Sequence, residues 1–290
     1  MTLSPVASPG NNLRLSNILA HKLTHHLSMI GPDGATHSVV AKGSGPTLIF
    51  LHGFPLDHRM WLEQLEYFSQ RYQVICPEFR GFGQSSTEES FSLAQLADDV
   101  EFIRSKVAES EKVFLCGLSM GGYVAFEYWA RHSRQLAGLI LANTKPTVED
   151  ERGRNLRLRM AEMALQVGAL PATQGMAGKL LGPNAPEQAS QLMAQIISSV
   201  PAKTLAASQR AMASRKDFST RLGSMETPTL VITGEHDIIA PPEDTQQWAE
   251  RIPNCQLEIL ADIGHMSPIE NASGFNQVLN TWLTKLTQDG

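Results

Sequence analysis

Residues 113–122 read VFLCGLSMGG, and this stretch decides the fold. A short apolar run leads into Gly-x-Ser-x-Gly, and a helix-like sequence follows at 123–130. A strand, a sharp turn and a helix in that order place a serine at the apex, where its hydroxyl stands clear of the sheet. Such a tight turn leaves almost no room for side chains on either side of the serine, and Gly117 and Gly121 meet that need. Ser119 is therefore the candidate nucleophile.

The composition narrows the class of protein. The chain has 290 residues, is 42% hydrophobic and 18% charged, and carries a net charge of −5. This length suits one large α/β domain or two smaller ones, and the absence of a dense basic cluster argues against nucleic acid as a partner. Three cysteines cannot form a full disulfide framework, so a reducing cytoplasm is the expected location. No apolar run reaches the ~18 residues of a membrane span, and we expect no membrane partner.

Short, β-branched and nearly all-apolar runs recur along the chain. Runs of this kind are buried on both faces, as in a parallel sheet covered by helices. Helical patterns separate most of them, which favours a doubly wound α/β sheet. A Pro-Asp-Gly turn at 31–34 predicts a hairpin before the first of these runs. The predicted strands span 47–51, 73–76, 112–116, 138–142, 229–233 and 256–260, and the predicted helices span 60–68, 92–107 and 122–131.

The strand–helix alternation breaks once, in the second half of the chain. Apolar residues across 149–167 recur at helical spacing. Pro171, Pro186 and Pro201 are typical of the first turns of further helices, with Asn184 nearby as a cap. We therefore predict a helical insertion that forms a lid over the serine. The predicted division is an N-terminal tail at 1–22, a core at 23–144 and 225–290, and a lid at 145–224.

A serine nucleophile needs a base, and the base needs an acid to orient it. Among nine histidines, His265 follows a predicted buried strand after a turn, and Gly264 before it permits a close approach. The acid should follow an earlier strand, where Asp237 and Glu235 both lie. We predict Asp237 as the acid and keep Glu235 as its competitor.

An oxyanion hole needs two backbone donors. The Met120 N–H follows the nucleophile directly in the sequence. The second donor should come from the loop after the strand at 47–51, and we predict the Phe54 N–H, because Pro55 has no N–H. The His52 side chain is expected to organise this loop through hydrogen bonds rather than to act as a second base.

Together these motifs resemble an α/β-hydrolase of the lidded, esterase-like branch, over about residues 28–286. The resemblance implies an α/β-hydrolase fold with a mostly parallel eight-stranded sheet, a Ser119–His265–Asp237 triad and the oxyanion donors named above. One departure is Glu78, where relatives usually carry aspartate before the Arg-Gly loop, and little effect on chemistry is expected from it. The motifs read HGFP at 52–55, RGFGQS at 80–85, GLSMGG at 117–122, GEHD at 234–237 and GH at 264–265.

The function implied by the resemblance is hydrolysis of a carboxylic ester or lactone through an acyl-enzyme. The HGFP and GLSMGG regions are similar to those of 3-oxoadipate enol-lactonases and of cofactor-free haloperoxidase-like esterases. Carbon–carbon bond hydrolases and lyases keep the same triad, and some hormone receptors use the same scaffold, so both stay as alternatives. Haloalkane dehalogenases and epoxide hydrolases need a carboxylate at the elbow, which Ser119 excludes. We expect no metal and no cofactor, because neither metal-ligand spacing nor a phosphate-binding loop is present.

A small-molecule ester or lactone is the expected partner, and the oligomeric state is left open. Methionine has a flexible, polarizable side chain that suits an adaptable apolar pocket. An arginine over the pocket would favour a lactone that bears a carboxylate, although a basic helix face is more typical of solvent contact. The predicted substrate contacts are Trp61, Met160, Met163 and Met193, and the arginines of the first lid helix are Arg152, Arg154, Arg157 and Arg159.

Overall fold

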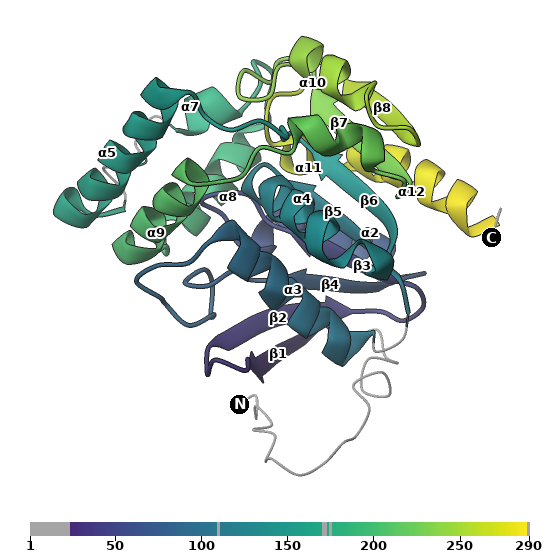
Figure 1. Cartoon of the computed structure of the whole chain (residues 1–290), viewed down its shortest axis with the longest axis horizontal. Coiled ribbons are helices and arrows are strands. Elements are labelled where there is room, and N and C mark those ends of the chain that lie inside the picture. The colour runs from purple at the N-terminus through teal and green to yellow at the C-terminus, as the bar shows by residue number, and fades with distance from the viewer. Residues whose placement is uncertain (1–23, 109–110, 170–172, 174–175, 289–290) are drawn as a thin grey trace.

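The computed structural model describes residues 24–108, 111–169, 173 and 176–288, so the predicted tail at 1–22 lies outside the described residues. Figure 1 shows one twisted sheet at the centre, with helices on both of its faces. The predicted strand bounds differ from the observed ones by at most two residues. The strands are β1 (His25–Ile30), β2 (Thr36–Lys42), β3 (Thr47–Leu51), β4 (Gln73–Pro77), β5 (Val113–Leu118), β6 (Leu136–Ala142), β7 (Thr229–Gly234) and β8 (Cys255–Leu260).

The eight strands form a single sheet in the order β1-β2-β4-β3-β5-β6-β7-β8. The predicted hairpin joins β1 to β2, and β2 also pairs antiparallel with β4. All the other neighbours are parallel. The predicted mostly parallel eight-stranded sheet is therefore confirmed. The strands β5, β6, β7 and β8 lie side by side, which brings their carboxyl ends to one edge of the sheet.

The core lies in two layers, one on each face of the sheet. Side chains alternate between the faces of a strand, so Ile49 and Leu51 of β3 enter one layer and Leu48 and Phe50 enter the other. Burial on both faces explains why the strands are apolar throughout. The first layer is covered by α3 (Leu93–Val107), α4 (Met120–His132) and α10 (Pro242–Ala249), and the second by α2 (Leu62–Phe68) and α12 (Ala272–Gln288).

The Ser92 hydroxyl caps α3 by accepting from the Gln95 N–H at 3.1 Å. Shorter helices complete the core.

None of the helices in the described part of the chain combines the length and the apolar character that a bilayer crossing requires. Cys76, Cys116 and Cys255 are free, and burial raises the pKa of each thiol. The shorter helices are η1 (His58–Trp61), η2 (Ser133–Gln135), η3 (Ser219–Ser224) and α11 (Ser267–Glu270).

The chain between β6 and β7 forms the predicted helical insertion. Its first helix packs along its last, at one side of the molecule in Figure 1. The Asp150 carboxylate caps the first helix by accepting from the Gly153 N–H at 2.7 Å. The described helices of the insertion are α5 (Glu151–Val167), α7 (Ala177–Leu180), α8 (Glu187–Ser198) and α9 (Ala202–Ala213).

The predicted helix starts in the insertion need two corrections. Pro186 and Pro201 occupy the N-cap positions of α8 and α9, one residue before the first turn. The prediction of Asn184 as a cap is wrong, because Pro186 is the N-cap of α8 and no side chain caps that helix. The Asn184 amide donates to the Asp262 carboxylate at 3.4 Å. Pro171 lies outside the described residues. Proline serves at these starts without a side-chain cap because the missing N–H is one that the helix leaves unpaired.

The insertion is joined to the loop that follows β8. The His265 N–H donates to the Leu180 carbonyl at 2.7 Å, and the Gly182 N–H donates to the Glu270 carboxylate at 2.7 Å. A Cβ on Gly264 would lie 2.3 Å from the Gly182 nitrogen, so only glycine allows this approach. The close approach predicted at Gly264 is therefore its contact with the insertion at Gly182.

Candidate active site

Ser119 lies on the turn between β5 and α4, in a conformation that side chains rarely adopt. Its backbone angles are φ 55° and ψ −112°. A Cβ on Gly117 would come within 2.3 Å of the Gly121 carbonyl oxygen, and one on Gly121 would come within 2.3 Å of the Leu51 carbonyl oxygen. Strain of this kind persists only where the surrounding structure holds it in place, and it is common at active sites.

The histidine and aspartate predicted from the sequence lie next to this serine. His265 follows β8 and Asp237 follows β7, at the same sheet edge as Ser119. The His265 Nε2 is 2.9 Å from the Ser119 Oγ, and its Nδ1 is 2.8 Å from Asp237 Oδ2. Both His265 and Asp237 are buried. The three side chains form one continuous line of hydrogen bonds.

Four donors hold the Asp237 carboxylate in place. Besides His265, the backbone N–H groups of Ile239 and Ala240 donate to Oδ1 at 2.8 and 2.9 Å, and the Asn143 amide donates to Oδ2 at 2.9 Å. Burial alone would raise the pKa of Asp237, but the interaction with His265 and these hydrogen bonds lower it below the usual value. The carboxylate therefore stays ionised beside the imidazole.

Glu235, the competitor for this role, lies elsewhere. Its side chain is exposed, and its carboxylate accepts from the Asp262 backbone N–H at 3.0 Å. The geometry thus pairs His265 with Asp237.

Two residues of the site were missed by the sequence analysis. Asn143, at φ 47°, donates to Asp237 and accepts from the Ser267 hydroxyl at 2.5 Å. Thr144 donates from its hydroxyl to the Ser119 carbonyl at 2.9 Å. A signal was present, because both polar residues come directly after the buried strand β6, and asparagine tolerates positive φ.

The loop after β3 lies against the nucleophile. A Cβ on Gly53 would be 3.5 Å from the Ser119 Cβ. His52 organises this loop with both ring nitrogens: Nδ1 donates to the Gly53 carbonyl at 3.1 Å, and Nε2 accepts from the Phe79 N–H at 3.1 Å. Burial lowers the pKa of His52, which keeps the ring neutral and suits this bonding.

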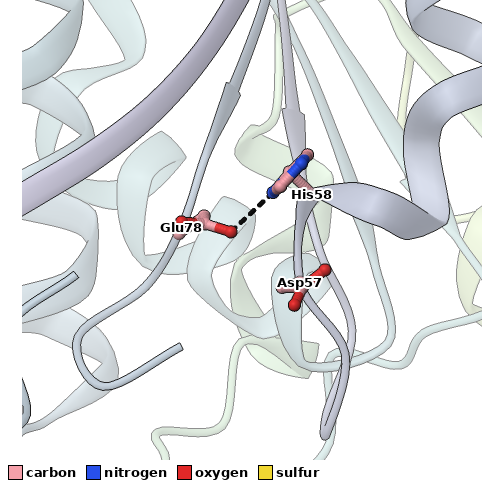
Figure 2. A group of neighbouring side chains, drawn as sticks. All are labelled: Asp57, His58 and Glu78. Atoms are coloured by element: carbon pink, nitrogen blue, oxygen red, sulfur yellow. Dashed lines mark hydrogen bonds and ion pairs between the residues drawn. The ribbon is translucent and has the colours of Figure 1, made fainter. Parts of the chain in front are cut away.

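A second hydrogen-bonded pair joins the start of η1, which follows this loop, to the loop after β4. Figure 2 shows the His58 ring directed at Glu78, and the Nδ1–Oε1 distance is 2.5 Å. Glu78 also accepts from the Gln84 N–H at 2.8 Å, and the Asp57 carboxylate is bound by Arg59. Burial would raise the pKa of Glu78, but the hydrogen bonds from His58 and from the Gln84 N–H lower it. Glu78, which departs from the family pattern, therefore bonds both to His58 and to the backbone of its own loop at Gln84.

Within the described part of the chain, two groups of side chains each bring three possible metal ligands together. The ligand atoms lie within 4.8 Å of one another in Asp57, His58 and Glu78, and in the exposed set of Glu235, His236 and Asp262. Neither group has a spacing that the sequence analysis recognised. In the first group, Arg59 already neutralises Asp57, and Glu78 is bonded to His58. The expectation of no metal stays a prediction.

The four predicted substrate contacts differ in how far they are buried. Trp61 and Met193 are 0% exposed and pack in the core layer under α2 and α12, and their role as substrate contacts stays a prediction. Met163 is 47% exposed on α5, and its role also stays a prediction. Met160 is half-buried, near the Gln209 amide, and its role stays a prediction. Helical spacing in the insertion could not separate its inner face from its outer face.

Met193→Ala should lower the free energy of unfolding by about 2–5 kcal/mol, because a fully buried methionine leaves a cavity behind. Met163→Ala is the matched control, and its effect should stay within about 0.5 kcal/mol. Urea denaturation followed by circular dichroism measures both values. Equal effects from the two changes would contradict the packing described here.

Arg157 is set apart from the other arginines of α5 by an ion pair. Arg152, Arg154 and Arg159 are exposed, whereas the Arg157 Nε donates to the Glu149 carboxylate at 2.6 Å. Arg215, after α9, donates to the same Glu149 oxygen at 2.9 Å. Burial would raise the pKa of Glu149, but the charges of Arg157 and Arg215 lower it to about 2. This carboxylate links the two ends of the α5–α9 pair.

The Glu149 pairing should make stability fall in acid. Its pKa is lowered from 4.5 when folded, so its contribution is complete above that pH and is lost as pH falls toward 2. We expect Glu149→Gln to cost on the order of 2 kcal/mol near neutral pH, and the difference from wild type to shrink below pH ~4. Urea midpoints measured across this range test it. A difference that is constant with pH would show that the charge on Glu149 contributes nothing.

Comparison with known proteins identifies the family of the chain. Residues 46–272 match the family model described as the alpha/beta hydrolase fold, and the chain belongs to this family. It is 28% identical over 266 residues to 3-oxoadipate enol-lactonase 1 of Acinetobacter baylyi, across 90% of this chain and 98% of that relative. The predicted resemblance to the enol-lactonase-like branch is confirmed.

Solved structures give the same result. A thermophilic esterase from Thermogutta terrifontis, determined with malate bound, has a TM-score of 0.87 and 31% identity, over 90% of this chain and 99% of that one. The enol-lactonase of Burkholderia xenovorans shares the fold, with a TM-score of 0.81 and 22% identity over 89% of this chain and 100% of that one.

Proposed function

We propose that this chain is a serine hydrolase that cleaves a carboxylic ester or a lactone through an acyl-enzyme. The observation that carries the proposal is the line of hydrogen bonds from Ser119 through His265 to Asp237. The names of the similar enol-lactonase and esterase support the bond type. The three free cysteines are in keeping with a reducing compartment such as the cytoplasm.

In the first half of the reaction, Ser119 Oγ attacks the substrate carbonyl carbon while His265 Nε2 takes its proton. Asp237, bonded to Nδ1, fixes the tautomer of the imidazole and stabilises the imidazolium that forms. The tetrahedral intermediate then collapses, and His265 returns the proton to the departing alkoxide. In the second half, His265 deprotonates a water that attacks the acyl-enzyme, which releases the acid and restores Ser119.

We propose that the backbone N–H groups of Phe54 and Met120 stabilise the oxyanion. Met120 is the first residue of α4, where the N–H has no partner within the helix and the helix dipole is positive. The loop that carries Phe54 lies against Ser119 at Gly53, as the close approach of Gly53 to the serine Cβ indicates. Donors of this kind typically contribute about 10²–10³ in kcat each.

Residues 145–224 are proposed to act as a lid that sets substrate choice. The three reacting side chains lie outside this segment, in the core proposed at 23–144 and 225–290, while Leu180 bonds directly to the backbone of His265. A lid docked beside the base can shape the acyl site without supplying acid–base groups. Met160, which is half-buried on α5, is the lid methionine proposed to contact substrate.

A panel of p-nitrophenyl esters of graded acyl length, measured beside enol-lactones, tests the proposal. We expect measurable turnover of short and medium acyl groups, and we expect it to depend on Ser119. Ester and lactone turnover near zero with tight ligand binding would instead indicate a receptor on a hydrolase scaffold. Cleavage of a carbon–carbon bond without ester hydrolysis would indicate the other reaction that this triad supports.

A further inference from the structure

Helix α5 exposes an apolar stripe that no other part of the described chain covers. Leu156, Met163 and Val167 are 51%, 47% and 52% exposed, and Met160 between them is half-buried. Spacings of four, three and four residues place these four side chains on one face of a helix. Apolar side chains gathered into an exposed patch are typical of an interaction surface.

The packing of α5 leaves this stripe open to a partner. The helix packs along α9, and its buried residues, Ala161 and Ala164, lie roughly 100° round the helix from the centre of the stripe. Figure 1 shows α5 at the outer edge of the molecule. A second protein can therefore reach the stripe without displacing the core.

The stripe is symmetric about its own centre. In an antiparallel pair of α5 helices centred between Met160 and Met163, each of these methionines lies opposite the other one of the second copy. Leu156 then lies opposite Val167 of the second copy, so every apolar residue of the stripe meets another. A two-fold axis requires this kind of match, because both copies contribute the same patch.

The polar side chains beside the stripe match in the same register. Asn155, Arg159, Glu162 and Gln166 are exposed along one flank of it. Within the described residues, neither Arg159 nor Glu162 has an ion-pair partner. In the antiparallel pair, Arg159 lies opposite Glu162 of the second copy, and the axis repeats this ion pair. The two amides, Asn155 and Gln166, lie opposite each other in the same way.

The charges of α5 favour a second copy over a lipid surface. A helix that binds an anionic bilayer carries an excess of lysine and arginine on its polar face. Three exposed basic and three exposed acidic residues cancel on α5 and its cap, so the helix offers no net attraction to such a surface. These residues are Arg152, Arg154 and Arg159 with Asp150, Glu151 and Glu162.

We propose that the α5 stripe is the interface of a two-fold symmetric dimer, in which the α5 helices of two copies pack antiparallel. Leu156, Met163, Val167 and the outward part of Met160 form its apolar centre. With 17 residues, α5 is about 25 Å long, so the contact is small. Interfaces at the low end of the size range are weak and reversible, and we expect the same of this dimer. The inference does not depend on the proposed reaction.

Sedimentation velocity of the full chain, from micromolar to millimolar concentration, measures the monomer–dimer equilibrium. The sedimentation coefficient of wild type should rise with concentration. Leu156→Asp should raise the dimer Kd by about 100-fold, because the symmetry buries the new charge twice. Leu158→Asp is the matched control. Leu158 is 37% exposed and lies about 200° round the helix from Leu156, so its Kd should stay within about twofold of wild type.

Charge reversal tests the register of the pair. Arg159→Glu and Glu162→Arg should each raise the Kd by about 10-fold, because each places like charges opposite each other. A mixture of the two variants should form a heterodimer of about wild-type strength, since each acidic side chain then faces a basic one. The double variant alone should recover in the same way. Mixing cannot repair a misfolded helix, and circular dichroism of each variant checks the fold.

Three results would overturn the dimer. The first is a wild type that stays monomeric at every concentration, and the second is a dimer that Leu156→Asp leaves intact. The third is a pair of charge-reversal variants that weaken the dimer and are not rescued by mixing. A monomeric wild type that binds phosphatidylglycerol vesicles, and loses this binding in Leu156→Asp, would assign the stripe to a membrane surface instead.

Discussion

Replacing Ser119 with alanine should abolish ester turnover and leave the fold intact. The serine hydroxyl lies 2.9 Å from His265 Nε2, and it forms the bond to the acyl group in the proposed reaction. Loss of a triad nucleophile typically removes about 10⁶ in kcat, and only the oxyanion donors and substrate binding contribute to the remaining rate. Steady-state kinetics on a p-nitrophenyl ester measure the loss.

A fluorophosphonate probe provides the control for this change. The probe should label wild type at Ser119 and leave Ser119→Ala unlabelled, while circular dichroism shows the same fold for both. Alanine at φ 55° is as strained as serine, so a small shift in thermal stability is acceptable. Labelling of another serine, or a variant as active as wild type, would contradict the assignment.

Replacing Asp237 with asparagine should lower kcat by about 10⁴-fold, as the same change does in a comparable triad. The amide can offer an N–H to His265 Nδ1, which favours the tautomer with its proton on Nε2. That tautomer cannot accept the proton of Ser119. Asparagine is close in shape to aspartate, so the bonds from Ile239 and Ala240 to this side chain can persist.

Glu235→Gln is the matched control for Asp237→Asn. Its carboxylate lies two residues away in the sequence, is exposed and bonds to the backbone of Asp262. Its removal should leave kcat within about twofold of wild type, since surface changes of this kind have small effects. If Glu235→Gln were the crippling change and Asp237→Asn the mild one, the acid would be misassigned.

The sheet and the positions of the three proposed triad residues could be predicted because their signals are local. A strand buried on both faces must be apolar throughout, and this sets its bounds to within two residues. The elbow at Ser119 needs glycines at fixed positions, and the ends of parallel strands place Asp237 and His265 at one edge. These constraints act within a few residues, so they are visible without the tertiary structure.

Contacts between distant segments account for what was missed. Asn143 contacts Asp237 and Ser267 across 94 and 124 positions of the sequence, and nothing local indicates those partners. The insertion shows the same limit, because helical spacing located α5 but did not show that Met163 faces outward. The sequence also did not show that Trp61 is fully buried in the core, since a large aromatic side chain fits a core and a pocket equally well.

The hydrogen bond from His265 to Leu180 has a consequence for engineering by exchange of the proposed lid. A chimera that replaces all of 145–224 with a segment from a relative also replaces the acceptor that holds the backbone of the base, at 2.7 Å. The donor segment must then supply a carbonyl at the same point and a glycine-sized residue opposite Gly264. Crossovers that keep 180–182 from this chain, and exchange α5 and α9 as a pair, preserve both contacts. In this scaffold, only crossovers of that kind can change the substrate range and still hold the backbone of His265, the proposed base, in place.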